Sequence, residues 1–252
     1  MSEAATSDEY QAARQPSRTT ESNKPLVIAI DGPSGSGKSS TARGVAERLG
    51  LAFLDTGAMY RAITWLALQE GVDLEDQAAV ARLLSHASIE IDQDPRRPAI
   101  AINGVDVSEA IRAPEVSAAV SIVAANLKIR ADLVARQKKL IAGAGDGIVA
   151  EGRDITTVVA PDAGVRVLLV ADPAARVARR HAELAEHEMD VDAVTDQVIR
   201  RDRDDSMVAQ FESAAPGVHV VDSTFLSLEE VIETICTFVP VRAHGDRRDP
   251  RG

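Results

Sequence analysis

Aromatic residues are scarce in this chain. They make up 3% of its 252 residues, with one tryptophan, two tyrosines and four phenylalanines. Hydrophobic residues as a whole reach 45%, so the chain has enough apolar material for a sizeable core, and that core must be mainly aliphatic. The length suits one large α/β domain with room for a small insert.

Cysteine is almost absent, because Cys236 is the only one. A single cysteine excludes a disulfide framework and a cysteine metal site. It lies in the apolar segment 231–238, so we expect it to act as a small buried hydrophobic residue. The chain also lacks a run long and apolar enough to cross a membrane, and residues 1–24 lack the apolar region of a signal peptide. These observations predict a cytoplasmic protein.

Positive charge is in deficit. The chain has 28 lysines and arginines against 39 aspartates and glutamates, a net charge of −11. This balance argues against general binding to nucleic acids or to anionic membranes. Any phosphate site must therefore be made locally basic by clustered arginines. Residues 1–24 and 241–252 are polar and predicted to be disordered tails.

One glycine-rich stretch dominates the remaining sequence. Residues 32–39 read Gly-Pro-Ser-Gly-Ser-Gly-Lys-Ser and fit the pattern G-x-x-x-x-G-K-[ST] at every fixed position. An apolar run at 26–30 predicts a buried strand before it, and residues 39–49 predict a helix after it. The alternative, a flexible glycine turn without a ligand, is disfavoured because the flanking elements also match.

This motif has a defined chemistry. Glycines let successive backbone N–H groups point at a polyphosphate, and the helix N-terminus adds partial positive charge. Lys38 is expected to reach the β and γ phosphates and the Ser39 hydroxyl to ligate Mg²⁺. The predicted nucleotide-binding residues are Gly32, Pro33, Ser34, Gly35, Ser36, Gly37, Lys38, Ser39 and Ser40.

Alternating strands and helices predict the fold. Strands are expected at 26–30, 52–55, 148–150, 165–170 and 218–222, which implies a central parallel sheet with helices on both faces. Residues 72–107 read as a small α+β insert with an antiparallel sheet of two strands, at 89–92 and 100–104, inside a domain of residues 25–240. Pro114 begins a helical region that we expect to break near Asn126, and Ser227 begins the last helix with a capping box.

Polar residues follow two of the predicted strands. Thr56 and Arg61 come after the second strand, and Arg153 follows the third, where parallel sheets bind ligands. All three are candidates for phosphate contacts, since arginine can clamp phosphoryl oxygens bidentately. The alternatives are a helix N-cap with a surface arginine, and a turn with a local ion pair.

Two helices within residues 173–208 carry many arginines interleaved with aspartates. One interpretation is a mobile lid that brings arginines over the phosphates. The other is a solvated hairpin held by salt bridges, and the two are compatible. The arginines are Arg176, Arg179, Arg180, Arg200, Arg201 and Arg203.

Several blocks together resemble the bacterial cytidylate kinase family. They are the glycine loop with Ile30 and Asp31 before it, residues 54–61, residues 105–112, residues 151–154 and residues 221–224, in that order. The resemblance covers roughly residues 26–238. It implies a P-loop nucleoside monophosphate kinase fold with an insert in the monophosphate-binding region and a helical lid. It also implies ATP-dependent phosphorylation of CMP and dCMP.

The resemblance also assigns roles to individual residues. It implies that Thr56, Arg61 and Arg153 hold the CMP phosphate and that Ser121, Arg130 and Asp154 meet the cytosine. Arg201 and Asp205 would meet the sugar, and Lys38, Arg153 and Arg201 would be catalytic, with ATP and Mg²⁺ as cofactors. The expected partners are small molecules only, and the protein is expected to act as a monomer.

Two positions depart from the family pattern. Thr156 stands where the family usually has glycine, and Val208 where the lid motif usually ends in arginine. Val208 predicts a working but impaired kinase, in which kcat suffers more than CMP affinity, with compensation open to Arg203, to Arg200 or to the Arg176–Arg180 group. Val208 and Thr156 also leave open a catalytically weakened nucleotide-binding regulator. A kinase of a small non-nucleotide metabolite is a further alternative, since other P-loop kinases share the glycine loop, but the residues directed at cytosine argue against it.

Overall fold

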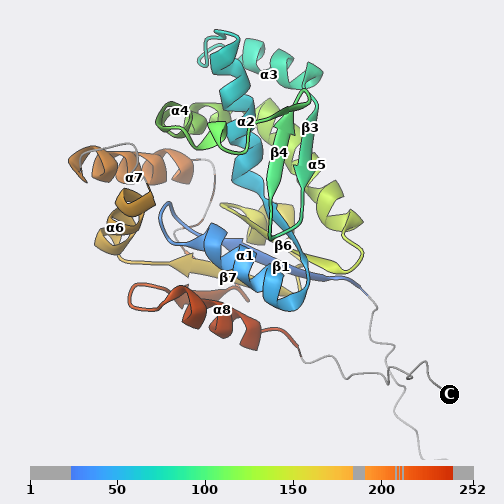
Figure 1. The fold of residues 1–252 in the computed structure, drawn as a ribbon, viewed down its shortest axis with the longest axis vertical. Coiled ribbons are helices and arrows are strands. Elements are labelled where there is room, and N and C mark those ends of the chain that lie inside the picture. The colour runs from blue at the N-terminus through green and yellow to red at the C-terminus, as the bar shows by residue number, and fades with distance from the viewer. Residues whose placement is uncertain (1–23, 184–190, 208, 210, 212, 241–252) are drawn as a thin grey trace, which may run out of the picture.

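A five-stranded parallel sheet forms the centre of the protein (Figure 1). The computed structural model describes residues 24–183, 191–207, 209, 211 and 213–240. The strand order is β2-β6-β1-β7-β8. The strands are β1 (Leu26–Asp31), β2 (Ala52–Asp55), β6 (Gly147–Gly152), β7 (Val165–Val170) and β8 (His219–Asp222). The predicted parallel sheet is confirmed.

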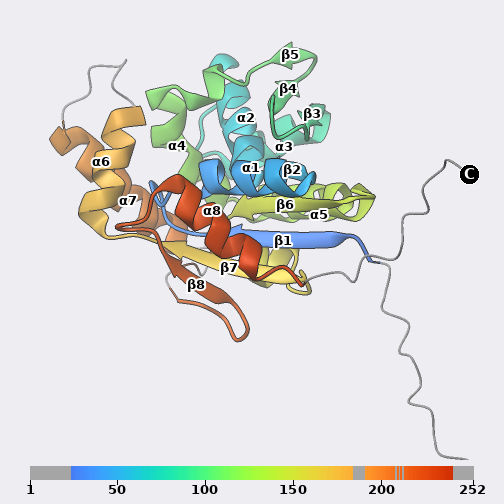
Figure 2. The same cartoon turned by 60° about the horizontal axis from the view of Figure 1, so that its bottom comes forward.

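Helices cover both faces of this sheet (Figure 2). On one face, α1 (Lys38–Leu49) and α8 (Leu228–Thr237) bury aliphatic side chains against β1, β6, β7 and β8. On the other, α5 (Leu127–Gly143) and the π-helical turn η2 (Ile155–Val159) pack on β1, β2 and β6. Cys236 is half-buried and packs against the first of these cores.

A second core lies beyond the sheet, among the elements between β2 and β6. They are α2 (Thr56–Gln69), α3 (Gln77–His86), β3 (Ile89–Asp92), β4 (Ala99–Ile102), β5 (Val105–Asp106), η1 (Ala110–Arg112) and α4 (Pro114–Ala125), and α5 adds Ile129 and Leu133 to this core. The segment predicted as an insert spans α3 and an antiparallel sheet of β3, β4 and β5. The prediction had two strands there and missed β5, which has only two residues. That this segment is a separate subdomain stays a prediction.

Local capping sets several helix boundaries. The Asn126 side-chain oxygen accepts hydrogen bonds from the backbone N–H groups of Lys128 and Ile129, which ends α4 and starts α5. The predicted break is thereby confirmed. Ser227 and Glu230 form the predicted capping box at α8.

The predicted lid contains α6 (Pro173–Glu183) and α7 (Val191–Ser206), which pack on each other beside the sheet (Figure 1). Asp172 accepts a hydrogen bond from the Ala174 N–H and caps α6. Residues 1–23 and 241–252, predicted as tails, lie outside the described residues. In the part of the chain that the structure describes, none of the helices has the length and hydropathy to span a bilayer.

Candidate active site

The glycine loop between β1 and α1 is an anion cradle. Gly35 and Gly37 have φ angles of 74° and 86°, a conformation that side chains other than glycine rarely adopt. A Cβ atom on Gly35 would also lie 2.6 Å from the Arg176 carbonyl oxygen. The Ser36 hydroxyl is buried in the loop without a hydrogen-bond partner among the described residues. The loop therefore has the backbone shape predicted from the motif and a polar group left open for a ligand.

A buried carboxylate, that of Glu151, bonds to Ser39, and its charge acts on Lys38. The Ser39 hydroxyl donates to Glu151 Oε1 over 2.6 Å, and Glu151 is 2% exposed at the end of β6. Burial, and then the charge of Asp55, raises the pKa of Glu151. Burial and the charge of Arg153 lower the pKa of Lys38 to about 8. Sequence reasoning gave Glu151 no role, although its position at the end of a strand beside β1 was a usable signal.

The three residues predicted to hold a phosphate come from two strand ends. The Thr56 hydroxyl donates to the Glu151 backbone carbonyl over 2.8 Å, and Arg61 pairs with Asp55 at 2.7 Å. Arg153 donates to the Gly32 carbonyl, and its guanidinium lies 4.9 Å from the centre of the Phe211 ring. The structure thus brings Arg153 directly onto the glycine loop.

Positive charge converges on Arg201. Its pKa is lowered to about 10, first by burial and then by the charges of Arg153, Arg61 and Arg180, although Asp205 opposes the shift. In a protein with a net charge of −11, this clustering of partly buried arginines is local. It is the basic cluster that the composition predicted for any phosphate site.

The residues predicted to bind the cytosine and the sugar form two groups, and the members of each group contact one another. Arg130 and Asp154 make an ion pair, and burial raises the pKa of Asp154 although Arg130 opposes the shift. The Ser121 hydroxyl donates to Asp205 over 2.8 Å, so Ser121 is bonded to the predicted sugar set and not to Arg130 or Asp154.

Asp205 is also paired with two arginines. Its carboxylate accepts from Arg153 Nε at 3.0 Å and lies 3.7 Å from Arg201 Nε. Burial alone would raise the pKa of Asp205, but Arg153 and Arg201 outweigh burial and lower it.

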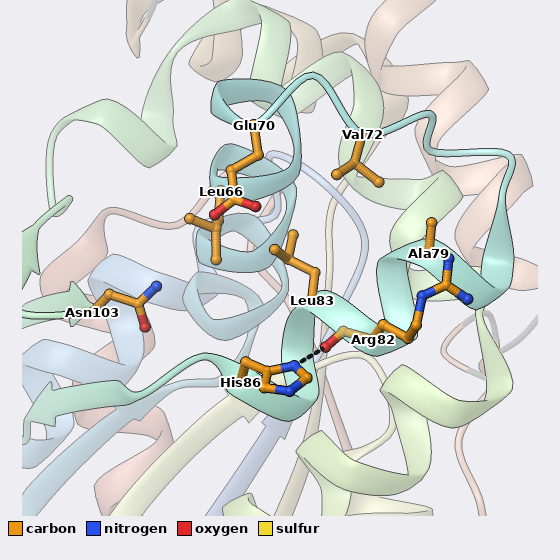
Figure 3. Close-up of a pocket in the computed structure, with 8 residues that line it drawn as sticks. All are labelled: Leu66, Glu70, Val72, Ala79, Arg82, Leu83, His86 and Asn103. Carbon is orange, nitrogen blue, oxygen red and sulfur yellow. Dashed lines mark hydrogen bonds between the residues drawn. The ribbon is translucent and has the colours of Figure 1, made fainter.

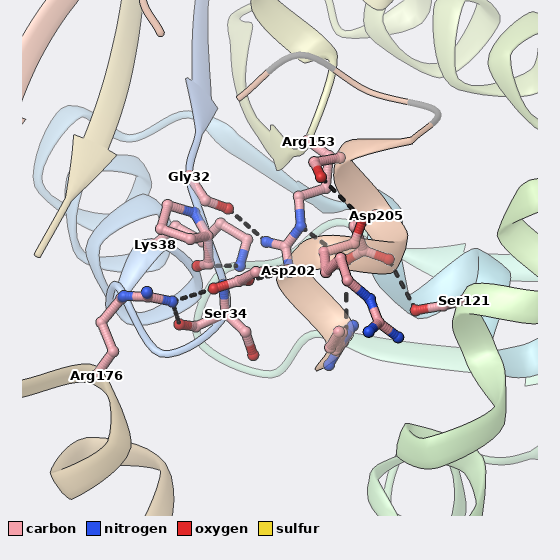
Figure 4. A network of polar contacts seen from close by, with 12 residues as sticks. Gly32, Ser34, Lys38, Ser121, Arg153, Arg176, Asp202 and Asp205 are labelled. Carbon is pink, nitrogen blue, oxygen red and sulfur yellow. Dashed lines mark hydrogen bonds and ion pairs between the residues drawn. The ribbon is translucent and has the colours of Figure 1, made fainter. Parts of the chain in front are cut away.

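The lid helices contact the glycine loop through Asp202 (Figure 4). Its carboxylate accepts from the Ser34 N–H over 2.8 Å and from Arg176, and Arg176 donates to the Ser34 carbonyl. The Asp202 carboxylate thereby accepts a hydrogen bond from one of the backbone N–H groups of the glycine loop, which the motif predicts to bind phosphate. Sequence reasoning treated the aspartates of these helices only as part of a charge pattern, and it missed this contact.

The solvated-hairpin interpretation fits only the outer side of α7. The Arg203 side chain is 73% exposed and pairs with Asp204, so it does not face the loop in this structure. Arg176 of α6 and Asp202 of α7 are mostly buried, and both bond to Ser34 of the glycine loop. Val208, on which the prediction of an impaired kinase depends, lies outside the described residues.

Comparison with known proteins decides the family. The model of the family described as cytidylate kinase matches residues 28–240. The chain belongs to the cytidylate kinase family. The predicted resemblance is confirmed.

Curated cytidylate kinases of several bacteria are similar to this chain over most of their length. The protein of Cutibacterium acnes is 55% identical over 221 residues, covering 87% of this chain and 98% of its own. The protein of Streptomyces avermitilis is 43% identical over 216 residues, covering 85% and 92%. The protein of Geobacillus kaustophilus is 44% identical over 223 residues, covering 86% and 97%.

Thr156, one of the two departures from the cytidylate kinase pattern, has a structural task here. Its hydroxyl and its N–H both donate to Asp31 Oδ2, at 2.7 and 2.8 Å, and the Ile155 N–H donates to Oδ1. Asp31 is 1% exposed at the end of β1. The threonine thus holds a buried carboxyl group directly before the glycine loop.

We expect Thr156→Val to lower the free energy of unfolding by about 1.5–3 kcal/mol, because it removes a hydrogen bond to a buried acid and adds no compensating partner. Urea denaturation measures this loss. Thr156→Ser keeps the hydroxyl and is the matched control. Equal stability of the valine and serine variants would contradict the task assigned to this hydroxyl.

A separate pocket lies between α2 and α3 (Figure 3). His86 Nδ1 lies 2.9 Å from the Arg82 carbonyl oxygen there. None of the residues predicted to bind nucleotide lines this pocket. Its lining residues are Leu66, Glu70, Val72, Ala79, Arg82, Leu83, His86 and Asn103.

Proposed function

We propose that this protein transfers the γ-phosphoryl group of ATP to CMP and dCMP. The observation that carries the proposal is the position of two sites at one sheet edge. The glycine loop follows β1, and the buried Arg130–Asp154 pair lies at the end of the adjacent strand β6. Membership of the cytidylate kinase family supports the choice of cytosine nucleotides. The release of ADP in the presence of CMP tests the proposal. Action as a monomer in the cytoplasm remains a prediction.

Ser39 and Glu151 fit a magnesium ion. Mg²⁺ prefers oxygen ligands and is commonly held by one or two carboxylates together with substrate phosphates. The Ser39 hydroxyl and the Glu151 carboxylate present such oxygens side by side below the loop. When bound, the ion supplies neutralisation of phosphate charge. Because burial raises the pKa of Glu151, a cation beside this carboxylate would stabilise its charged form.

The chain's own residues then have two tasks, positioning and charge neutralisation. The acceptor is an anionic phosphate oxygen of the monophosphate, so no general base is needed. Lys38 faces the phosphates of the donor, and Arg61, Arg153 and Arg201 surround the acceptor phosphate. Preorganised cations of this kind stabilise the charge that spreads over the transferring group.

Asp154 supplies the base specificity in this proposal. Cytosine presents an amino donor at C4, which a carboxylate accepts, whereas uracil presents a carbonyl there. Arg130 donates to the acceptor atoms of the cytosine ring. Uracil would leave a buried carboxylate against a carbonyl oxygen, at a cost of roughly 1–3 kcal/mol for each mismatched group.

The titration of Lys38 predicts how kcat/KM for ATP depends on pH. Its pKa near 8 in the free protein means that the ammonium is charged below pH 8 and neutral above it. Since kcat/KM reports the free enzyme, we expect kcat/KM for ATP to fall about tenfold per pH unit above pH 8. The fall in kcat should begin at higher pH, because bound phosphates favour the charged lysine.

Lys38→Arg is the control for this profile. Arginine stays protonated throughout the range, so the variant should be slower at every pH but should lose the decline near pH 8. The same alkaline decline in the arginine variant would assign it to another group.

A further inference from the structure

The Phe211 ring lies against the Arg153 guanidinium inside the protein. The central carbon of the guanidinium stands over the ring, 4.9 Å from its centre. The ring is 2% exposed and packs with Leu168 and Ala209, while the Arg153 side chain is 15% exposed. A cation over an aromatic ring is attracted by the negative charge of the ring face, most strongly where both groups are withdrawn from water. The ring therefore holds Arg153 by its face.

The other contacts of Arg153 lie along the edge of its guanidinium (Figure 4). Nε donates to Asp205 Oδ2 over 3.0 Å, and Nη1 donates to the Gly32 carbonyl. Nη2 lies 4.0 Å from Asp202 Oδ1 and makes no hydrogen bond within the part of the chain that the structure describes. Because the N–H donors of a guanidinium lie in its plane, the Phe211 ring uses none of them. Nη2 is thereby left to donate to a phosphate oxygen.

The ring is itself fixed to the central sheet. Phe211 follows α7, and the Ala209 N–H between them donates to the Asp205 carbonyl over 3.0 Å. Leu168, a neighbour of the ring, belongs to β7, and Val170 of the same strand packs against the same cluster. The aromatic face therefore has a defined position relative to the glycine loop, which follows the adjacent strand β1.

We propose that Phe211 is a positioning residue for the acceptor phosphate. Its ring holds the Arg153 guanidinium so that Nη2 serves the phosphate of CMP and not the carboxylate of Asp202. A carboxylate in place of the ring would also hold the arginine, but it would neutralise the charge that attracts the phosphate. Without the ring, Arg153 is free to close the 4.0 Å gap to Asp202, and that ion pair competes with the phosphate. This inference rests on the proposed function.

Phe211→Leu tests the proposal, because leucine stays apolar and lacks the aromatic face. Calorimetric titration measures the dissociation constants of CMP and of cytidine, which has no phosphate. We expect CMP to bind about tenfold more weakly to the variant while cytidine binds equally well, since only the phosphate contact is lost. The value of kcat/KM for CMP should fall by the same factor. Phe211→Met, which also lacks a ring, should give the same shift.

Val218→Ala is the matched control for this experiment. Val218 packs on the same small cluster, so its truncation lowers the urea midpoint without removing the aromatic face. The ratio of the CMP and cytidine constants should stay that of the unaltered protein. In an Arg153→Ala background, Phe211→Leu should weaken CMP binding no further, because both changes remove one interaction.

Equal weakening of CMP and cytidine binding by Phe211→Leu would make the ring a purely structural element and overturn the proposal. An unchanged dissociation constant for CMP, or losses that add in the double variant, would overturn it as well. If the unaltered protein binds CMP no more tightly than cytidine, or releases no ADP with CMP, the proposed function itself fails, which is a different outcome.

Discussion

Replacing Lys38 by alanine is expected to lower kcat by about 10³-fold without unfolding the protein. The lysine is the cation at the base of the glycine loop, where its ammonium nitrogen lies 3.4 Å from the Pro33 carbonyl oxygen. Its depressed pKa shows that burial and Arg153 make the ammonium costly to keep in the free protein. We expect a bound phosphate to offset this free-energy cost by pairing with the ammonium.

Single-turnover and steady-state ADP release measure this effect, and circular dichroism with urea denaturation measures the fold. Because the folded protein lowers the pKa of Lys38, removing this ammonium should not lower the stability of the variant. Lys139→Ala on the exposed side of α5 is the matched control and should leave kcat unchanged. A Lys38→Ala variant with near-normal kcat would exclude phosphoryl transfer at this loop.

The second large effect is expected for Asp154→Asn. The neutral amide no longer attracts the cytosine amino group as a carboxylate does, and it leaves Arg130 without its ion-pair partner. We expect kcat/KM for CMP to fall by roughly 10²-fold, and that for UMP to fall less or to rise, because an amide N–H can face the uracil carbonyl.

Competition between CMP and UMP in one reaction measures the ratio directly. Asp132→Asn removes a partly exposed aspartate that pairs with Arg136 on α5, and it should change neither rate. A CMP to UMP ratio that survives Asp154→Asn would show that cytosine is recognised elsewhere.

Local sequence patterns predicted the glycine loop, its flanking strand and helix, and two helix boundaries. The glycine loop, the strand before it and the helix after it depend on neighbours in sequence, and so do the caps at Asn126 and Ser227. The resemblance placed Arg153 and Asp205, which the structure brings into contact. Their roles in binding remain predictions.

The contacts that sequence reasoning missed are long-range. Asp202 meets Ser34 across 168 positions, and Glu151 meets Ser39 across 112. A charge pattern on α7 indicates a polar helix but not which carboxylate reaches the loop.

The assay of ADP release with each nucleoside monophosphate in turn tests the central claim most directly. The protein would be supplied with ATP and Mg²⁺, and with CMP, dCMP, UMP, AMP, GMP or dTMP at equal concentration. The buried Arg130–Asp154 pair beside the glycine loop predicts rapid ADP release with CMP and dCMP, and much slower release with the other four. Equal rates with all six, or no release with CMP and dCMP, would contradict this account.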